Sequence, residues 1–264
     1  MSQRHPEYFV HGYALVPEIF DSSELHILQQ LANGLVTRHR SGDPKVCANT
    51  LSIAAAFRAQ PERNPGIEPA QWEREPFIIS DLVAIEPRFA TLFANERMWR
   101  SVAEMLECSV AEVVFHFCNL TRKPPMAGPA ISWHRDAKNT YFAAEDGRTL
   151  RLLIPLQSMS TSNGGTGVVP RSHREKDAAI DNAIWPTVCA GSGLAIHSET
   201  LHGGSANRSG QERDIIVIQF GWRSSCLRFQ AQNVLSLASF ESFRVFFGDR
   251  LPDESQGDRF PTVT

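Results

Sequence analysis

The sequence lacks the features that would mark a membrane protein or a nucleic-acid-binding protein. No apolar run approaches the roughly 20 residues needed to cross a bilayer, and the first residues, Met1 to Pro6, show no apolar segment of a leader peptide. Lysine and arginine number 26 against 29 aspartate and glutamate, a net charge of -3, so no basic excess is present. We therefore expect a cytoplasmic protein that binds neither nucleic acid nor membrane.

Cysteine is scarce and scattered. The chain has five cysteines and no C-x-x-C pair, which argues against a disulfide framework and against a thiolate zinc site. Internal repeats and low-complexity segments are also missing. With 264 residues, of which 42% are hydrophobic and 21% charged, the chain has the composition of a soluble globular protein and the length of a single domain.

What is present divides into three parts. Residues 1–109 are expected to form a helical flank and a lid, with β character over 8–19, a capped helix over about 22–33, a proline-rich lid over 38–76 and a helical pattern over 87–107. Residues 110–223 show short β runs separated by turns, at 112–121, 131–136, 149–156, 166–169, 193–197 and 213–223. Residues 224–264 add one helix, over 237–247, and a polar tail. Many short strands without intervening helices predict a mainly β sandwich or barrel with flanking helices.

The first candidate for chemistry is the run Ile131-Ser132-Trp133-His134-Arg135-Asp136. On a strand, His134 and Asp136 share one face and Arg135 takes the other. An imidazole and a carboxylate aimed at one point make half of a metal site with two histidines and one carboxylate.

A third ligand has several candidates, because His173, His197 and His202 all follow in the β region. A single histidine in a β protein is more often structural than a metal ligand. His202 is favoured because Gly203 and Gly204 beside it allow close approach of the backbone.

Arg213 opens the most apolar strand of the chain, Ile215-Ile216-Val217-Ile218. A guanidinium at the start of a buried strand needs an anionic partner, and its fork suits a carboxylate. A salt bridge to a neighbouring acidic residue competes with a ligand for that role.

Taken in order, these segments resemble the phytanoyl-CoA dioxygenase family of Fe(II)- and 2-oxoglutarate-dependent oxygenases. The resemblance covers about residues 8–223 and is carried by these motifs: His134-x-Asp136, Asn163-Gly164-Gly165, Pro170-Arg171-Ser172-His173, the run from Gly193 to Ser209, the opening Gly12 to Pro17, and Asn119 to Pro125.

The resemblance implies a double-stranded β-helix, which is a jelly-roll barrel of the cupin type. His134, Asp136 and His202 would be the catalytic iron ligands, and Arg213 would pair with the distal carboxylate of 2-oxoglutarate. Thr121 and Asn119 would hydrogen-bond this co-substrate. Reaction with O2 would release succinate and CO2, and Asp136 favours hydroxylation over halogenation because halogenating relatives have a small residue there.

One departure from the family concerns the position two residues after the distal histidine. Many members have a serine there that also contacts 2-oxoglutarate, whereas this chain has Gly204 followed by Ser205. That contact is therefore left open.

The substrate is the least determined feature. Lys138, Asn139 and Tyr141 are expected near the barrel mouth, and Asn49, Arg58 and Arg63 on the lid. Without an obvious basic patch for a coenzyme A nucleotide, a small metabolite of specialised biosynthesis is favoured as substrate. The alternatives are desaturation, epoxidation or ring formation by the same iron chemistry, a metal-dependent cupin enzyme that does not use 2-oxoglutarate, and a non-catalytic binding protein. The oligomeric state is not indicated.

Overall fold

A computed structural model describes residues 5–139, 142–228 and 235–248 of the chain. Its centre is a pair of antiparallel sheets. The large sheet has the strand order β1-β8-β6-β10-β4-β3-β2 and the small sheet the order β5-β9-β7. The strands of the large sheet are β1 (Tyr13–Val16), β2 (Thr50–Ser52), β3 (Pro76–Ser80), β4 (Val113–Lys123), β6 (Thr149–Pro155), β8 (Gly193–His197) and β10 (Arg213–Trp222). Those of the small sheet are β5 (Ile131–His134), β7 (Thr166–Val168) and β9 (His202–Gly204).

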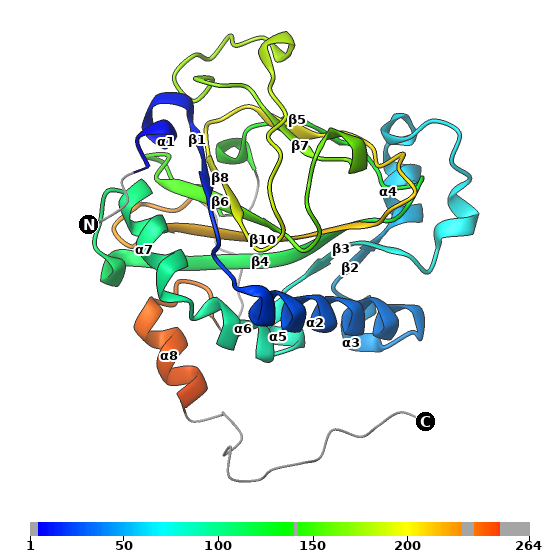
Figure 1. Ribbon diagram of the computed structural model, residues 1–264, viewed down its shortest axis with the longest axis horizontal. Coiled ribbons are helices and arrows are strands. Elements are labelled where there is room, and N and C mark those ends of the chain that lie inside the picture. The colour runs from blue at the N-terminus through cyan, green and yellow to red at the C-terminus, as the bar shows by residue number, and fades with distance from the viewer. Residues whose placement is uncertain (1–4, 140–141, 229–234, 249–264) are drawn as a thin grey trace.

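Helices cover the outer face of the large sheet. Figure 1 shows the small sheet on one side of β4 and β10, and α2, α5 and α6 on the other. The helices are α1 (Pro6–His11), α2 (Ser22–Arg40), α3 (Pro44–Cys47), α4 (Ile53–Ala59), α5 (Leu82–Ile85), α6 (Arg88–Phe93), α7 (Glu96–Met105) and α8 (Phe240–Gly248). The described residues also form short 3-10 turns: η1 (Pro61–Arg63), η2 (Pro69–Trp72), η3 (Val110–Glu112), η4 (Asp136–Lys138), η5 (Thr161–Asn163) and η6 (Ile180–Asn182).

Two apolar layers hold this arrangement together. The larger one fills the space between the helices and the large sheet, and its buried side chains run from Tyr8 to Phe243. The smaller one lies between the two sheets and includes Leu153, Ile215 and Val217. Alternation along β10 turns Arg213, Ile215 and Val217 towards the cavity, in the part of the strand before its register with β4 shifts between Gln219 and Phe220.

The structure corrects several local predictions. The β segment predicted over 8–19 with a break at Gly12 is a strand only after that glycine, because α1 occupies Pro6–His11 with proline at its first turn and ends at Gly12, whose φ of 81° closes the helix. The helix predicted over about 22–33 continues to Arg40. The helical pattern over 87–107 is two helices, since Asn95 caps a new one.

The expected lid contains more regular structure than its prolines suggested. Pro44, Pro61 and Pro69 do not interrupt elements but begin them, at the first turn of α3, η1 and η2. Pro76 opens β3. The flank before residue 110 is therefore not wholly helical, because it supplies β1, β2 and β3 to the large sheet.

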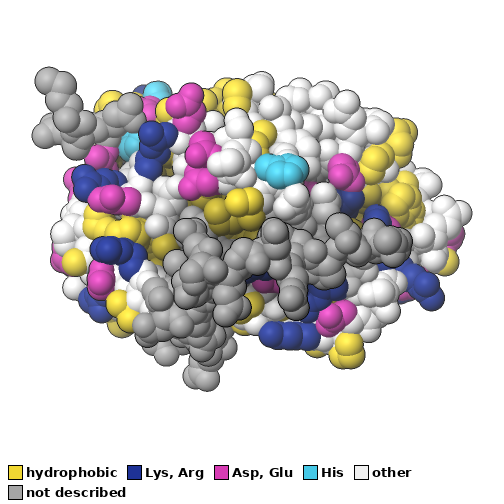
Figure 2. All heavy atoms as spheres, turned by 60° about the horizontal axis from the view of Figure 1, so that its bottom comes forward, with side chains coloured by type: hydrophobic (Ala, Val, Ile, Leu, Met, Phe, Trp, Pro, Cys, Tyr) yellow, Lys and Arg dark blue, Asp and Glu magenta, His cyan; other side chains and the backbone are white. Residues whose placement is uncertain are grey.

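The surface carries charges of both signs. On the face seen in Figure 2, acidic and basic side chains are interspersed and the apolar ones lie in separate small groups. Among the described residues, no helix is both long and apolar enough to cross a membrane.

Candidate active site

Three side chains converge where the small sheet meets the barrel interior. β5 ends at His134, which is paired with His202 at the start of β9. The strand stops there, and Asp136 begins the turn η4 rather than continuing β5 as predicted. The turn nevertheless brings the carboxylate back: His134 Nε2 lies 3.4 Å from Asp136 Oδ1, and His202 Nε2 lies 3.6 Å from Oδ2. The donor atoms of all three lie within 4.8 Å of one another.

Two glycines fix the outer side of this pair of strands. A Cβ on Gly203 would lie 3.0 Å from the Trp133 ring, and one on Gly167 would lie 3.0 Å from both Trp133 and Trp185. The indole of Trp133 thus packs against the backbone of Gly203 and Gly167, and Trp185 lies edge-on to it at 5.9 Å between ring centroids. Because Trp133 precedes His134, this packing holds the histidine towards the interior.

The hydrogen bonds of the two histidines fix which nitrogen faces the carboxylate. His134 Nδ1 lies 2.8 Å from the carbonyl oxygen of Ser132, and His202 Nδ1 lies 2.9 Å from that of Thr200. A carbonyl only accepts, so each Nδ1 carries the hydrogen and each Nε2 presents a lone pair. Burial lowers the pKa of His202 to about 4, which keeps this ring neutral near pH 7.

Asp136 is buried; its Oδ1 lies 3.0 Å from the Nη1 of Arg151, while its Oδ2 has no hydrogen-bond donor within the described part of the chain. Burial by itself would raise the pKa of the Asp136 carboxyl, but Arg151 first, and then His202 and His134, hold it well below its ordinary value. Two lone pairs and an ionised carboxylate facing one point need a cation between them. Carbonyls on the far ring nitrogens are also typical of metal-binding histidines. The residues present therefore fit a divalent metal.

A second polar group lies at the other end of the same cavity. Arg213 is 2% exposed, and its Nη2 donates to the carbonyl oxygen of Gly164 at 2.9 Å. The Nζ of Lys123, which is completely buried, lies 3.1 Å from the same oxygen and also donates to the carbonyl oxygen of Ser205. The Nε of Arg213 is buried without a partner in the described structure. Two cations thus meet at one carbonyl, and within the described part of the chain no carboxylate pairs with either of them.

Lys123 lines the cavity although no sequence pattern singled it out. It stands beside Arg122 and ahead of Pro124, at the end of β4. Burial, then Arg213 and Arg63, lowers its pKa well below the ordinary value for lysine. Its Nζ lies 3.1 Å from where a Cβ on Gly204 would be. The ammonium therefore fills the space next to Gly204, while Ser205 offers Lys123 its carbonyl oxygen.

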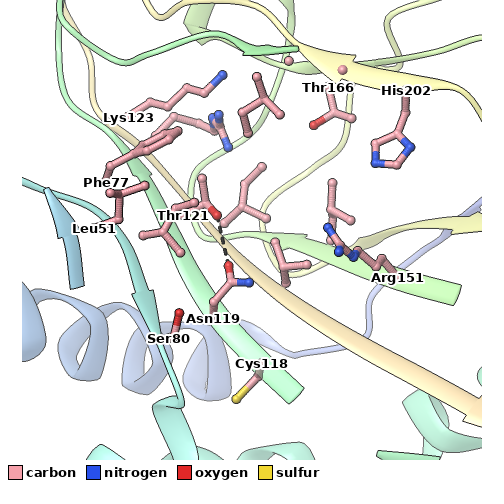
Figure 3. A pocket seen from close by; sticks show the side chains of 18 of the residues that line it. Leu51, Phe77, Ser80, Cys118, Asn119, Thr121, Lys123, Arg151, Thr166 and His202 are labelled. Carbon is pink, nitrogen blue, oxygen red and sulfur yellow. Dashed lines mark hydrogen bonds between the residues drawn. The ribbon is translucent and has the colours of Figure 1, made fainter. Parts of the chain in front are cut away.

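Thr121 and Asn119 lie where the alternation of β4 predicts. Both line the cavity, and the Oγ1 of Thr121 donates to the Oδ1 of Asn119 at 3.0 Å. Figure 3 shows this bond at the centre of the cavity, between Lys123 on one side and Arg151 on the other. Both side chains therefore present polar atoms to the same cavity as the triad and the cation pair.

These groups share one cavity of about 550 Å³. Its apolar wall includes Leu51, Phe77, Ile78, Phe117 and Leu153. In Figure 3, Leu51 and Phe77 lie on the side of Lys123, and His202 lies across the cavity from them. A pocket with an apolar wall and a few convergent polar groups is typical of a small-molecule site.

Of the residues predicted on the lid and at the barrel mouth, only Arg63 lines the cavity within the described part of the chain. Arg63 lines the cavity with its guanidinium 5.9 Å from the Phe77 ring centroid, and its carbonyl oxygen accepts from the Ala130 amide at 3.0 Å. Arg58 instead pairs with Glu73 on the surface, and the Asn49 amide bonds to the backbone of its own segment. Lys138 and Asn139 do not line the cavity, and Tyr141 lies outside the described residues.

The other histidines considered as ligands lie elsewhere. The rings of His173 and His197 are 5.3 Å apart and border a separate cavity with Tyr8. Arg135 points away from the triad and donates to backbone carbonyls, including that of Glu175 at 3.1 Å. Among the three candidate histidines, the structure therefore brings only His202 to the pair His134 and Asp136.

Comparison with solved structures identifies the fold. EctD from S. alaskensis, crystallised with 2-oxoglutarate and 5-hydroxyectoine, is similar with a TM-score of 0.70 and 20% identity over 90% of this chain and 83% of that one. SnoK, a non-heme alpha-ketoglutarate-dependent carbocyclase from nogalamycin biosynthesis, gives 0.65 and 15% over 89% and 88%. EvdO2 from Micromonospora carbonacea, complexed with 2-oxoglutarate, gives 0.63 and 19% over 88% and 94%. The predicted jelly-roll barrel of the cupin type is confirmed.

Sequence comparison adds the family. Residues 8–215 match the family model described as phytanoyl-CoA dioxygenase (PhyH). No curated protein matches the chain in sequence.

Proposed function

This chain belongs to the phytanoyl-CoA dioxygenase family, and from that premise we propose that it is an Fe(II)- and 2-oxoglutarate-dependent dioxygenase that hydroxylates an unactivated C–H bond of a small metabolite. One observation carries the proposal. A triad of two histidines and a carboxylate lies at one cavity with a buried pair of cations, and no carboxylate of the described residues pairs with these cations. A metal site alone would not need the cation pair, whereas a chelating diacid needs both.

His134, Asp136 and His202 would hold the iron. Bound there, the iron would use O2 and 2-oxoglutarate to oxidise the substrate, with release of succinate and CO2. The tautomers fixed by the carbonyls of Ser132 and Thr200 present both Nε2 lone pairs without rearrangement of either ring.

The cation pair would receive the distal carboxylate of 2-oxoglutarate. Arg213 and Lys123 supply donors from β10 and β4, and the shared carbonyl of Gly164 holds both donors at one end of the cavity. Thr121 and Asn119 would hydrogen-bond the middle of the co-substrate. Ile215, Val217 and Leu153 pack around this region and exclude water, which strengthens the ionic contacts.

Hydroxylation is favoured over halogenation because Asp136 occupies the carboxylate position of the triad. Its lowered pKa keeps it ionised, so it competes with any halide for the metal. Desaturation, epoxidation or ring formation would use the same residues, and SnoK, one of the structural neighbours, is a carbocyclase.

The charges around the cavity favour an acidic substrate. Four cationic side chains stand against two carboxylates: Arg63, Lys123, Arg151 and Arg213 against Asp81 and Asp136. The charges of Fe(II) and of the 2-oxoglutarate dianion cancel, so a surplus of up to two positive charges remains. Arg63 is half-buried on the lid, above the apolar wall at Phe77. We assign it to an anionic group of a substrate with an apolar body.

We favour specialised-metabolite biosynthesis over degradation of fatty acyl-CoA. The face seen in Figure 2 has interspersed charges and no large basic patch for a coenzyme A nucleotide. A cytoplasmic location fits the five free cysteines. One domain is the simplest description, since the larger core layer joins residues from Tyr8 to Phe243.

Anaerobic addition of Fe(II) and 2-oxoglutarate tests the proposal. The purified protein should develop a visible metal-to-ligand charge-transfer band, and His134→Ala should abolish it. A folded, metal-loaded protein that shows no band would contradict the use of 2-oxoglutarate and favour the alternative, a cupin enzyme with other chemistry. Succinate release that depends on a candidate acid, and mass spectrometry of the product, would then distinguish oxygen insertion from desaturation.

A further inference from the structure

One arginine in the barrel interior lies beside the triad and not beside the cation pair. Arg151 stands in the apolar strand β6, between Leu150 and Leu152, and its side chain is 12% exposed. It points into the cavity from the side opposite Lys123, as Figure 3 shows. An arginine placed there must find an anion, because an unpaired buried cation is costly.

The anion that Arg151 meets is the ligand carboxylate itself. Its Nη1 lies 3.0 Å from Asp136 Oδ1, while His202 Nε2 lies near the other oxygen at 3.6 Å. The ion pair is buried on both sides, since the Asp136 side chain is 2% exposed. Arg151 thus engages one particular oxygen of a residue that also serves the metal.

A buried chain of contacts holds the guanidinium in this place. The Nε of Arg151 lies 3.4 Å from the Oε1 of Gln219, and its guanidinium lies 5.5 Å from the Phe117 ring centroid. Gln219 is 1% exposed, and its Nε2 donates to the carbonyl oxygen of Phe142 at 2.9 Å. That same amide nitrogen is 3.0 Å from His116 Nδ1. Because Nε2 is engaged by an acceptor, the amide oxygen must face Arg151.

The consequence concerns how Asp136 can bind a metal. A carboxylate can chelate through one oxygen or through both, and chelation through both would occupy a position that a 2-oxo acid or O2 requires. An arginine held 3.0 Å from Oδ1 competes for that oxygen. We propose that Arg151 is a positioning residue that restricts Asp136 to one metal-binding oxygen and so preserves the site for 2-oxoglutarate. This role rests on the proposed function.

A positioning role for Arg151 predicts different effects on metal affinity and on 2-oxoglutarate affinity, whereas a merely structural role would change both together. Replacing Arg151 by methionine removes a positive charge near the metal and releases Oδ1, so divalent metal should bind as well as before or more tightly. The affinity for 2-oxoglutarate should fall by about 10-fold or more, the size typical of groups that orient metal ligands.

The experiment uses the full chain and its variants Arg151→Met, Arg151→Lys and Arg148→Met. Arg148 is the matched control, since its guanidinium lies 3.7 Å from the Trp222 ring centroid and it does not line the cavity. Mn(II) affinity is measured by calorimetry. The affinity for 2-oxoglutarate is then measured anaerobically on the Fe(II)-loaded protein, from its charge-transfer band.

We expect Arg151→Met to retain Mn(II) binding, to lose affinity for 2-oxoglutarate and to shift the charge-transfer band. Arg151→Lys should recover part of the affinity for 2-oxoglutarate. Arg148→Met should have the affinities of the wild type. Parallel loss of both affinities in Arg151→Met would overturn the proposal in favour of a structural role. Unchanged affinities would also overturn it and leave Arg151 to the substrate. If wild type itself shows no band, the proposed function fails, and this outcome is distinct from failure at Arg151.

Discussion

Buried charged side chains on the two faces of the β4–β10 strand pair differ in whether the protein supplies their counter-charge. β4 and β10 are in register such that Arg122 lies opposite Asp214 and Lys123 lies opposite Arg213. On the outer face, Arg122 Nη1 lies 2.6 Å from Asp214 Oδ2, and Glu212 adds a second carboxylate. On the inner face, one residue along each strand, two cations face each other across the carbonyl of Gly164.

The difference separates a structural ion pair from the cation pair to which we assign a ligand. The outer pair satisfies its charges within the protein, and its removal should affect folding. Like charges directly opposite on neighbouring strands are destabilising, so the inner pair lowers stability until an anion arrives. Function is therefore indicated by a contact that the protein leaves incomplete, not by burial or by charge alone.

The largest expected effects come from replacing the inner arginine, Arg213, or the outer arginine, Arg122, by methionine. Arg213→Met should weaken 2-oxoglutarate binding about 100-fold or more, because a buried charge partner is lost, without loss of stability in the free protein. Arg122→Met should lower the free energy of unfolding by about 3 kcal/mol, because Asp214 is left buried without its partner. Calorimetric titration and urea denaturation check the two. Equal effects of both variants on stability would contradict the comparison.

Lys123→Met sharpens the same contrast on the other strand. The affinity for 2-oxoglutarate should fall about 10-fold, and metal affinity should not change, since the Lys123 ammonium contacts the carbonyls of Gly164 and Ser205 rather than the triad. The free protein should be as stable as wild type or more so. Titration with Mn(II) and thermal melting of the free protein provide the measurements; a loss of metal affinity would place Lys123 outside the role assigned to it.

A pH dependence follows from the lowered pKa of Lys123. Burial, Arg213 and Arg63 lower it in the free protein, and a bound carboxylate would favour the charged ammonium. The complex should therefore take up a proton, so 2-oxoglutarate affinity should decline as the pH rises towards the ordinary lysine pKa of about 10.4. The free protein should gain stability over the same range, because the unfolded chain binds the proton more strongly. Titrations at several pH values should show the decline in wild type and no such slope in Lys123→Met.

The smallest effect concerns Thr121. Thr121→Val keeps the shape but removes the donor to Asn119 Oδ1, so the affinity for 2-oxoglutarate should fall only a few-fold, about threefold for one neutral hydrogen bond. Asn119→Ala serves as the companion variant. A loss as large as that of Arg213→Met would mean that this threonine, rather than the cation pair, dominates co-substrate binding.

The sequence reached part of this site and missed the rest for identifiable reasons. His134 and Asp136 followed from their spacing, and Arg213 from its position at the start of an apolar strand. The same criterion applied to Arg151, which stands inside the equally apolar run Leu150 to Ile154, and could have selected it. Lys123 had no such signal, because its burial depends on Gly204 and on the turn at Gly164, both distant in sequence.

The fold shows a similar boundary. The β core could be predicted because its strands carry their own apolar runs, but β9 spans only His202–Gly204, two of whose residues are glycine. A strand of that composition has no local propensity, and its pairing with β5 and β7 defines it. The edge strand β2 likewise arises from its pairing with β3, within a segment that its prolines had marked as a loop.

Because Trp133 packs against Gly203 and Gly167 beside the triad, its fluorescence can report metal binding without an added label. The indole is one residue from His134 and lies against Gly203, which follows His202. A paramagnetic ion held by these two histidines would be close enough to quench the fluorescence of the indole. Diamagnetic Zn(II) at the same ligands would quench it less. Titration of tryptophan fluorescence in the unmodified protein would thus follow metal loading directly, and Trp133→Phe would reveal how much of the signal arises at this position.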